Sequence, residues 1–170
     1  MATQRTVVKV EGAEQLIATL TEIQEDFGYA KADKFLVGAA RSSMNSVLQK
    51  AKQLVPVDTG ALRASLQVEA RKPTSKDKRS QYVNFSDVAV AFVTTASGKK
   101  LKKKSFKNVR TGQKQVGITS DARSIALEFG TRLVAAKPYL RPALESEQGR
   151  ILVSLGNSLA VQLEKYRRVS

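Results

Sequence analysis

Residues 55–66 read V-P-V-D-T-G-A-L-R-A-S-L and divide a helical part of the chain from a part with strands. Before this stretch, apolar residues recur at three- and four-residue intervals, which is the period of a helix with one buried face. Pro56 cannot continue such a helix, because it lacks a backbone N–H and disfavours helical backbone in the residue before it. The stretch therefore predicts a structural turn at Pro56, Asp58, Thr59 and Gly60, residue types that favour turns.

The N-terminal part is predicted to form two amphipathic helices. A weakly alternating segment at 6–10 indicates a short strand. A helical stripe follows over 13–28 and ends at a glycine. A longer helix then carries its apolar face from Phe35 to Val55. The two stripes are typical of faces that form a core.

Strand patterns follow the turn. Another helical turn is predicted over 61–66, then a strand over 66–69 and a polar loop over 71–84. The strongest strand pattern is 87–96, in which both alternating faces are largely apolar, as in a central strand covered by helices. A short strand is predicted at 115–118.

The C-terminal part is again helical. A short helix is predicted over 122–129, stopped by Gly130 and Thr131, and an irregular segment leads to Pro142 in the first turn of a final helix. We expect that helix to bury one stripe, formed by Leu144, Ile151, Leu152, Leu155, Leu159, Leu163 and Tyr166. The predicted fold is α+β: N-terminal amphipathic helices and a C-terminal helix packed on a small, mostly antiparallel sheet, in a single domain over 1–170.

Composition excludes several classes of protein. The chain has no Cys and no His, which removes disulfides, thiolate nucleophiles, most zinc sites and the commonest general base, so no cofactor is expected. The longest apolar run, 88–93, is far shorter than a membrane helix, and the N-terminus does not read as a signal peptide. We expect a soluble protein made in a cytoplasm.

The formal charge of +14 is concentrated in one part of the chain. Residues 67–115 hold thirteen Lys and Arg against three Asp and Glu, and the tract 98–114 has eight positive charges and no acid. Such a run is typical of a mobile loop or hairpin, here at about 97–115. It can also contact phosphates without reading sequence, or an acidic partner, through Lys99, Lys100, Lys102, Lys103, Lys104, Lys107, Arg110 and Lys114.

The D-T-G-A motif admits a catalytic interpretation. In aspartic proteases this loop carries the catalytic carboxylate, and a homodimer contributing one Asp58 per chain would supply two carboxylates sharing a proton. Here the motif follows a helix rather than a strand, and no later apolar-apolar-Gly segment supports it. We therefore expect no catalytic residue, and expect Asp58 or Thr59 to cap the helical turn that follows by accepting backbone N–H groups.

Two blocks together resemble a known family. The stretch 55–66, and A-L-E-F-G-T-R-L-V-A-A-K-P-Y-L-R-P-A-L-E at 126–145, look like the paired signature of the small tail-completion, or head-tail joining, proteins of long-tailed bacteriophages. The resemblance implies a non-catalytic α+β virion protein at the neck, made in the bacterial host. It also implies a second turn or assembly contact at Glu128, Phe129, Gly130, Thr131, Pro138, Tyr139, Arg141 and Pro142.

The same resemblance implies partners. The subunit would assemble into a ring of approximate six-fold symmetry and contact a head-completion protein and the tail terminator or tail tube. The basic tract exceeds what the family pattern requires and could meet genomic DNA in the channel or an acidic surface on the next ring. The alternative function is non-specific nucleic-acid binding through the same lysines.

Overall fold

The computed structural model describes residues 18, 21–22, 25, 29–80, 83, 89–96, 105–116 and 122–167. The strand predicted at 6–10, most of the helix predicted over 13–28, and Lys99, Lys100, Lys102, Lys103 and Lys104 lie outside these residues. In the described part, helices precede and follow two antiparallel strand pairs, so the predicted α+β class is confirmed.

The helix predicted up to Val55 is divided in two. Helix α2 spans Tyr29–Ser43 and α3 spans Asn45–Leu54, with Met44 between them at φ −79° and ψ −1°. The Oγ atoms of Ser42 and Ser43 donate to the carbonyls of Gly38 and Ala40 at 3.2 and 2.9 Å. Such bonds to the preceding turn often bend helices, which accounts for the break that apolar periodicity alone did not predict.

The predicted helix end before Pro56 is confirmed. Val55 adopts extended backbone, with ψ 129°. The short helix α4, Ala61–Ser65, then leads directly into strand β1, Leu66–Arg71. The 3-10 helix η1, Asp77–Arg79, lies in the segment that was predicted to be a loop.

Strand β2, Val90–Thr95, pairs antiparallel with β1 in a register that joins Leu66 to Thr95 and Arg71 to Val90. The prediction of a central strand was wrong for the described residues, where β1 is the one neighbour of β2. Every residue of β2 is half-buried. Its continuous apolar pattern arises because helices cover one face while its outer edge lines a groove described below.

The basic tract ends in an ordered hairpin. Strands β3, Ser105–Lys107, and β4, Lys114–Val116, pair antiparallel. Asn108 is buried at the turn, where its Oδ1 accepts from the backbone N–H groups of Arg110 and Thr111 at 2.9 and 3.3 Å. Of the two forms predicted for the tract, a loop or a hairpin, the described residues from 105 onward form this hairpin.

Helix α6, Ala122–Phe129, ends where predicted, and α7, Leu140–Arg167, holds Pro142 in its first turn. The predicted buried stripe of α7 was partly wrong, because Leu144 and Leu152 are exposed. The buried line instead follows Ala143, Glu147 and Leu159, with Ile151 and Leu155 half-buried. The buried line is shifted by one residue from the predicted line through Leu144 and Leu152, which corresponds to a rotation of about 100° around the helix axis.

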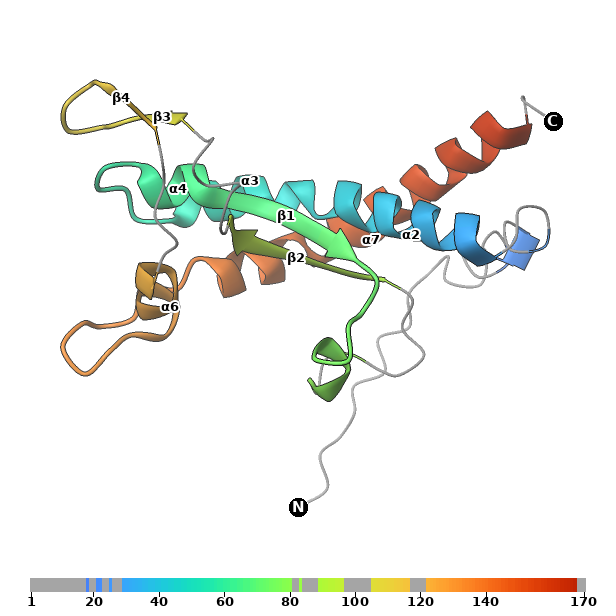
Figure 1. Cartoon of the computed structure of the whole chain (residues 1–170), viewed down its shortest axis with the longest axis horizontal. Coiled ribbons are helices and arrows are strands. Elements are labelled where there is room, and N and C mark those ends of the chain that lie inside the picture. Colours follow the sequence, from blue (N-terminus) through green and yellow to red (C-terminus); the bar gives the residue numbers. More distant parts are fainter. Residues whose placement is uncertain are drawn as a thin grey trace, which may run out of the picture.

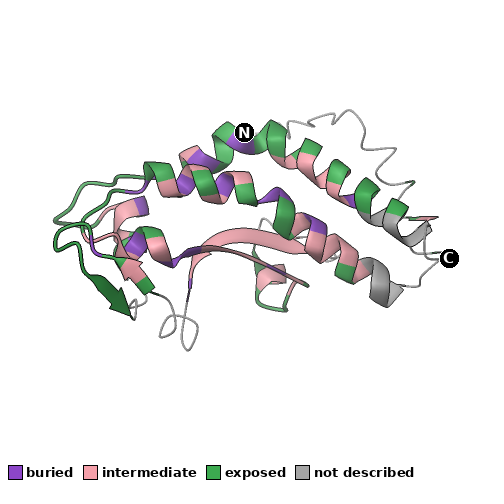
Figure 2. Cartoon of the chain, turned by 90° about the horizontal axis from the view of Figure 1, so that it is seen from above, coloured by how far each residue is buried: buried purple, intermediate pink, exposed green. Residues whose placement is uncertain are grey.

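Helices α2 and α3 lie against the β1–β2 pair, and α7 crosses both α2 and α3 (Figures 1 and 2). One cluster joins α3, α4, β1 and α7, and it consists of Met44, Val47, Ala51, Val55, Leu62, Leu66, Tyr139 and Ala143. Val68, Ala91 and Val93 of the sheet pack against it. Of the helices described, none is long and apolar enough to cross a membrane.

Candidate functional site

Three turns lie together at one end of the molecule, and the C-terminal end of α7 lies at the other (Figure 1). They are residues 55–60, the hairpin turn 108–113 and the loop 130–139, and we call them together the loop end. Nearly all of their residues are exposed or half-buried, as the green and pink segments in Figure 2 show. The structure thus brings together both sequence blocks and the described half of the basic tract.

The D-T-G turn anchors the hairpin. The carbonyl of Thr59 accepts from the backbone N–H of Val109 at 3.0 Å, and Asp58 Oδ1 lies 2.7 Å from Arg110 Nε. Gly60, with φ 89°, passes close beneath, so that a Cβ there would lie 3.4 Å from Val109 Cγ2. Sequence reasoning did not pair the turn with the hairpin, because these residues are about fifty positions apart.

The N-cap residue of α4 is Gly60, which has no side-chain cap bond, and the predicted bond to a backbone N–H of this turn is made by Thr59 and not by Asp58. Thr59 Oγ1 accepts from the backbone N–H of Ala61 at 3.3 Å. The Asp58 side chain is more than half exposed and pairs with Arg110, so of the two predicted acceptors only Thr59 accepts a backbone N–H in the described part. The hairpin is held further by Phe106, which packs with Ala61 and Ala64 around the buried Ala96.

The fold should therefore need Gly60 more than Asp58. We expect Gly60→Ala to lower the free energy of unfolding by about 1–2 kcal/mol, because L-residues are disfavoured at positive φ. Asp58→Asn should cost less than about 1 kcal/mol, because its ion pair is exposed. Denaturant unfolding of both variants measures the difference. A larger loss in Asp58→Asn would contradict this assignment.

The second turn is built around the carboxylate of Glu128. Its Oε2 accepts from the backbone N–H groups of Tyr139 and Leu140, both at 2.9 Å, and Oε1 accepts from that of Arg141 at 3.0 Å. Burial raises the pKa of Glu128, but these three bonds and the charge of Arg141 outweigh it and hold the pKa below its ordinary value. Glu128 thus caps the N-terminus of α7 from another helix.

Tyr139 completes this junction and is fully buried. Its hydroxyl lies 2.7 Å from Ser124 Oγ on α6. Of the two roles predicted for the second block, the structure places Glu128 and Tyr139 inside the fold. Phe129, Thr131, Pro138 and Arg141 are exposed, and Pro142 is half-buried.

The loop 130–139 is shaped by its own hydrogen bonds. Gly130 has φ 77°, and a Cβ there would lie 3.0 Å from the backbone N of Ala136. Thr131 Oγ1 accepts from the N–H groups of Leu133 and Val134 at 3.3 and 3.1 Å, and the Thr131 N–H donates to the Val134 carbonyl at 2.8 Å. The Lys137 N–H donates to the Leu127 carbonyl at 2.7 Å.

The two turns lie against the same helix. Pro56, Asp58 and Thr59 of the first turn and Arg123 and Leu127 of α6 line a small cavity of about 70 Å³. Leu127 also bonds to the second turn through its carbonyl. Helix α6 therefore fixes the position of one turn relative to the other.

An apolar groove of about 570 Å³ opens beside α6, with Arg141 and Glu128 among its lining residues. Ala91, Phe92 and Val93 line it consecutively. Because successive strand residues point to opposite faces, this places the groove along the edge of β2. Ile125, Phe129 and Leu144 line it with exposed fractions of 66%, 68% and 43%. Sequence reasoning missed this groove, since it had assigned Leu144 to the core.

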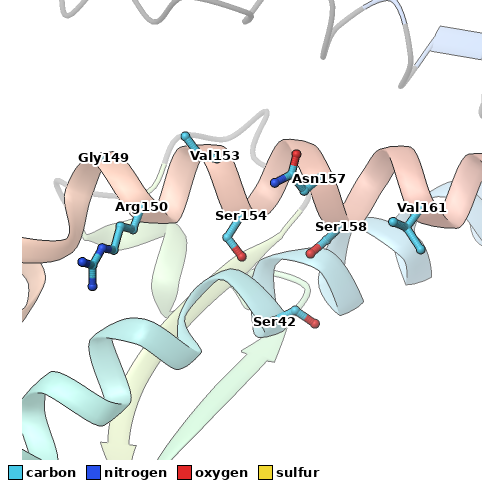
Figure 3. Close-up of a pocket in the computed structure, with 8 residues that line it drawn as sticks. All are labelled: Ser42, Gly149, Arg150, Val153, Ser154, Asn157, Ser158 and Val161. Atoms are coloured by element: carbon cyan, nitrogen blue, oxygen red, sulfur yellow. The ribbon is translucent and has the colours of Figure 1, made fainter.

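A second hollow, of about 630 Å³, lies between α2 and α7. Figure 3 shows Ser42 of α2 opposite Ser154 and Ser158 of α7, with Arg150 at one end and Val161 at the other. Arg150 lies 3.4 Å from Glu147 of its own helix. Within the described part of the chain, no three acidic side chains are grouped as metal ligands.

The loop end is strongly cationic. Its turns and the flanking α4, hairpin strands, α6 and first turn of α7 carry eight basic residues, namely Arg63, Lys107, Arg110, Lys114, Arg123, Arg132, Lys137 and Arg141. The acidic residues in the same described segments are Asp58, which pairs with Arg110, and Glu128, which is buried. Basic and apolar side chains thus share one exposed end.

These features define a small α+β protein with a contact surface at one end. The family model of HK97-gp10-like proteins, described as bacteriophage tail components, matches residues 14–130, and the chain belongs to this family. The match includes the D-T-G turn and ends at Gly130, the first residue of the loop 130–139, so it does not cover the rest of that loop or α7. No curated protein and no solved structure matches the chain. The chain is therefore a structural component of a phage virion.

Proposed function

We propose that this tail component completes the tail and joins it to the head at the neck, as one subunit of a six-fold ring. The observation that supports this is the loop end, where exposed cationic and apolar side chains are held on turns that are tied firmly to the helices. A joining ring must contact its own copies and the rings above and below. A head-completion protein and the tail terminator or tail tube are the proposed neighbours.

Loss of the chain from its phage tests the joining role. DNA-filled heads and finished tails should accumulate separately in lysates, and the purified chain should join them when it is added. Electron microscopy counts the joined particles. Absence of tails would instead place the chain in tail-tube assembly, and normal virions would exclude both roles.

The basic hairpin is proposed to make weak, exchangeable contact with DNA that passes through the ring. Binding that depends on phosphate charge is independent of sequence and falls steeply with salt, as suits a conduit. Tight binding that survives moderate salt would favour the alternative function, a non-specific nucleic-acid-binding protein. The structure shows how to remove the charge without losing the hairpin, because Phe106, Val109 and Arg110 are its anchors.

A variant that keeps these anchors and replaces the tract's seven lysines with Gln should lose at least about 10²-fold in affinity for a short DNA duplex at low salt. The slope of log K against log salt concentration should become shallower by several units. The lysines are Lys99, Lys100, Lys102, Lys103, Lys104, Lys107 and Lys114. Fluorescence anisotropy over a salt series measures both quantities.

The matched control replaces seven lysines outside the loop end, namely Lys9, Lys31, Lys34, Lys50, Lys52, Lys76 and Lys165, which gives the same net charge of +7. It should retain most of the affinity. Equal losses in the two variants would mean that net charge, and not the hairpin, determines binding.

A further inference from the structure

The loop 130–139 presents a preformed apolar knob, which we define as residues 132–134. Leu133 is 92% exposed and Val134 is 51% exposed, whereas the apolar side chains of the core are at most 9% exposed. The hydrogen bonds of Thr131 to Leu133 and Val134 fix the backbone of the knob before any contact is made. A preformed knob loses little conformational entropy when it docks.

The groove along β2 has the matching chemistry. Buried Met44 and Val47 line it together with exposed Ile125, Phe129 and Leu144. Exposed apolar surface of this kind marks contact sites. Leu133 does not fill the groove of its own chain, since it remains almost fully exposed.

We propose that the knob of one copy of this chain inserts into the groove of the next copy. Knob and groove are different patches on one subunit, so the contact is heterologous, and repetition of such a contact closes a ring when the rotation permits. The inference rests on the proposed ring and names the contact that builds it.

Charge at the two patches supports a second copy as the occupant. Arg132 precedes Leu133 on the knob, and Glu145 follows Leu144 on the groove rim. Both charged side chains are exposed, and neither has an ion-pair partner among the described residues. Docking Leu133 beside Leu144 would bring this Arg and this Glu near each other, and complementary charge fixes register.

The net charge of +14 on every copy opposes association at low salt. Salt screens this repulsion over distances beyond the Debye length while the apolar contact persists. The mass in solution should therefore rise as salt is increased to about 0.3 M, where the Debye length is below the ~8 Å of physiological ionic strength.

Cysteine cross-linking tests the contact directly, because the chain has no Cys of its own. A chain carrying both Leu133→Cys and Leu144→Cys should form a ladder of disulfide-linked multimers under mild oxidation, since the two side chains meet between copies. The control chain carries Leu133→Cys and Val161→Cys, the latter exposed on α7 outside the groove. Absence of the ladder, or equal ladders in both chains, would overturn the proposal.

Leu133→Asp supplies a second measurement. The side chain is almost fully exposed, so the variant should fold normally, as circular dichroism can show, yet sediment as a monomer at about 0.3 M salt where the parent chain is oligomeric. Val153→Asp, at a site 66% exposed on α7, should keep the parent mass.

An unchanged mass in Leu133→Asp, or a monomeric parent chain, would overturn the contact even if the protein still joins heads to tails. Cross-linked rings that fail to join them would instead contradict the proposed function alone.

Discussion

Glu128→Ala is expected to lower the free energy of unfolding by about 2–4 kcal/mol. The carboxylate accepts three backbone N–H groups at the start of α7, and a buried donor left without a partner costs about 1–3 kcal/mol. The cost exceeds that of an ordinary helix cap, about 1 kcal/mol, because one side chain satisfies three donors at once. Urea unfolding followed by circular dichroism measures the loss.

Glu145→Ala is the matched control for this prediction. Glu145 also lies near the N-terminus of α7, but its side chain is exposed and has no ion-pair partner in the described residues. Its replacement should change the free energy of unfolding by no more than about 0.5 kcal/mol. Equal effects of the two substitutions would show that general charge near the helix end, and not the three hydrogen bonds, provides the stabilisation.

The same carboxylate predicts a dependence of stability on pH. The pKa of Glu128 lies below its ordinary value of 4.5 in the folded chain, so the folded state favours the charged form. Its stabilisation is present above pH 4.5 and is lost as the pH falls through the lower folded value. The stability difference between the parent chain and Glu128→Gln should therefore shrink below pH 4.5.

Asp77 adds to acid sensitivity in the same direction. Hydrogen bonds from Arg71 and then from Thr74 hold the pKa of Asp77 far below its ordinary value. Because both chains in the comparison retain Asp77, its contribution cancels in the difference between the parent and Glu128→Gln. An unchanged difference across the acid range would contradict the assignment to Glu128.

The capping role of Glu128 also shows where sequence reasoning stops. The end of α3 before Pro56 and the end of α6 at Gly130 were predicted correctly because proline and glycine act on adjacent backbone. The residue before α7 is Tyr139, whose side chain cannot cap the helix. The first N–H groups of α7 therefore needed an acceptor from elsewhere in the chain. A missing local cap is the signal that could have indicated this contact.

Two further features depend on distances that sequence patterns do not encode. Asp58 and Arg110 meet only because the hairpin folds back over α4. The buried line of α7 is set by how that helix crosses α2 and α3, which placed Leu144 in the groove and Glu147 in the interior. Apolar periodicity found the helix but not its rotation, and the groove was missed for that reason.

Tyr139→Ala is expected to be the most destabilising substitution at the junction of α6 and α7, with a loss of about 3–5 kcal/mol. The side chain is fully buried in the cluster that joins α3, α4, β1 and α7, so its removal leaves a cavity within that cluster. Thermal or urea unfolding measures the loss.

Tyr139→Phe separates the ring from the hydroxyl. It keeps the packing and removes the 2.7 Å contact with Ser124 Oγ, so it should cost only about 1–2 kcal/mol, mainly because the buried Ser124 hydroxyl loses its partner. Adding Ser124→Ala should recover part of that loss, because both polar groups are then absent. If Tyr139→Phe cost as much as Tyr139→Ala, the hydroxyl pair and not the ring would hold α6 against α7.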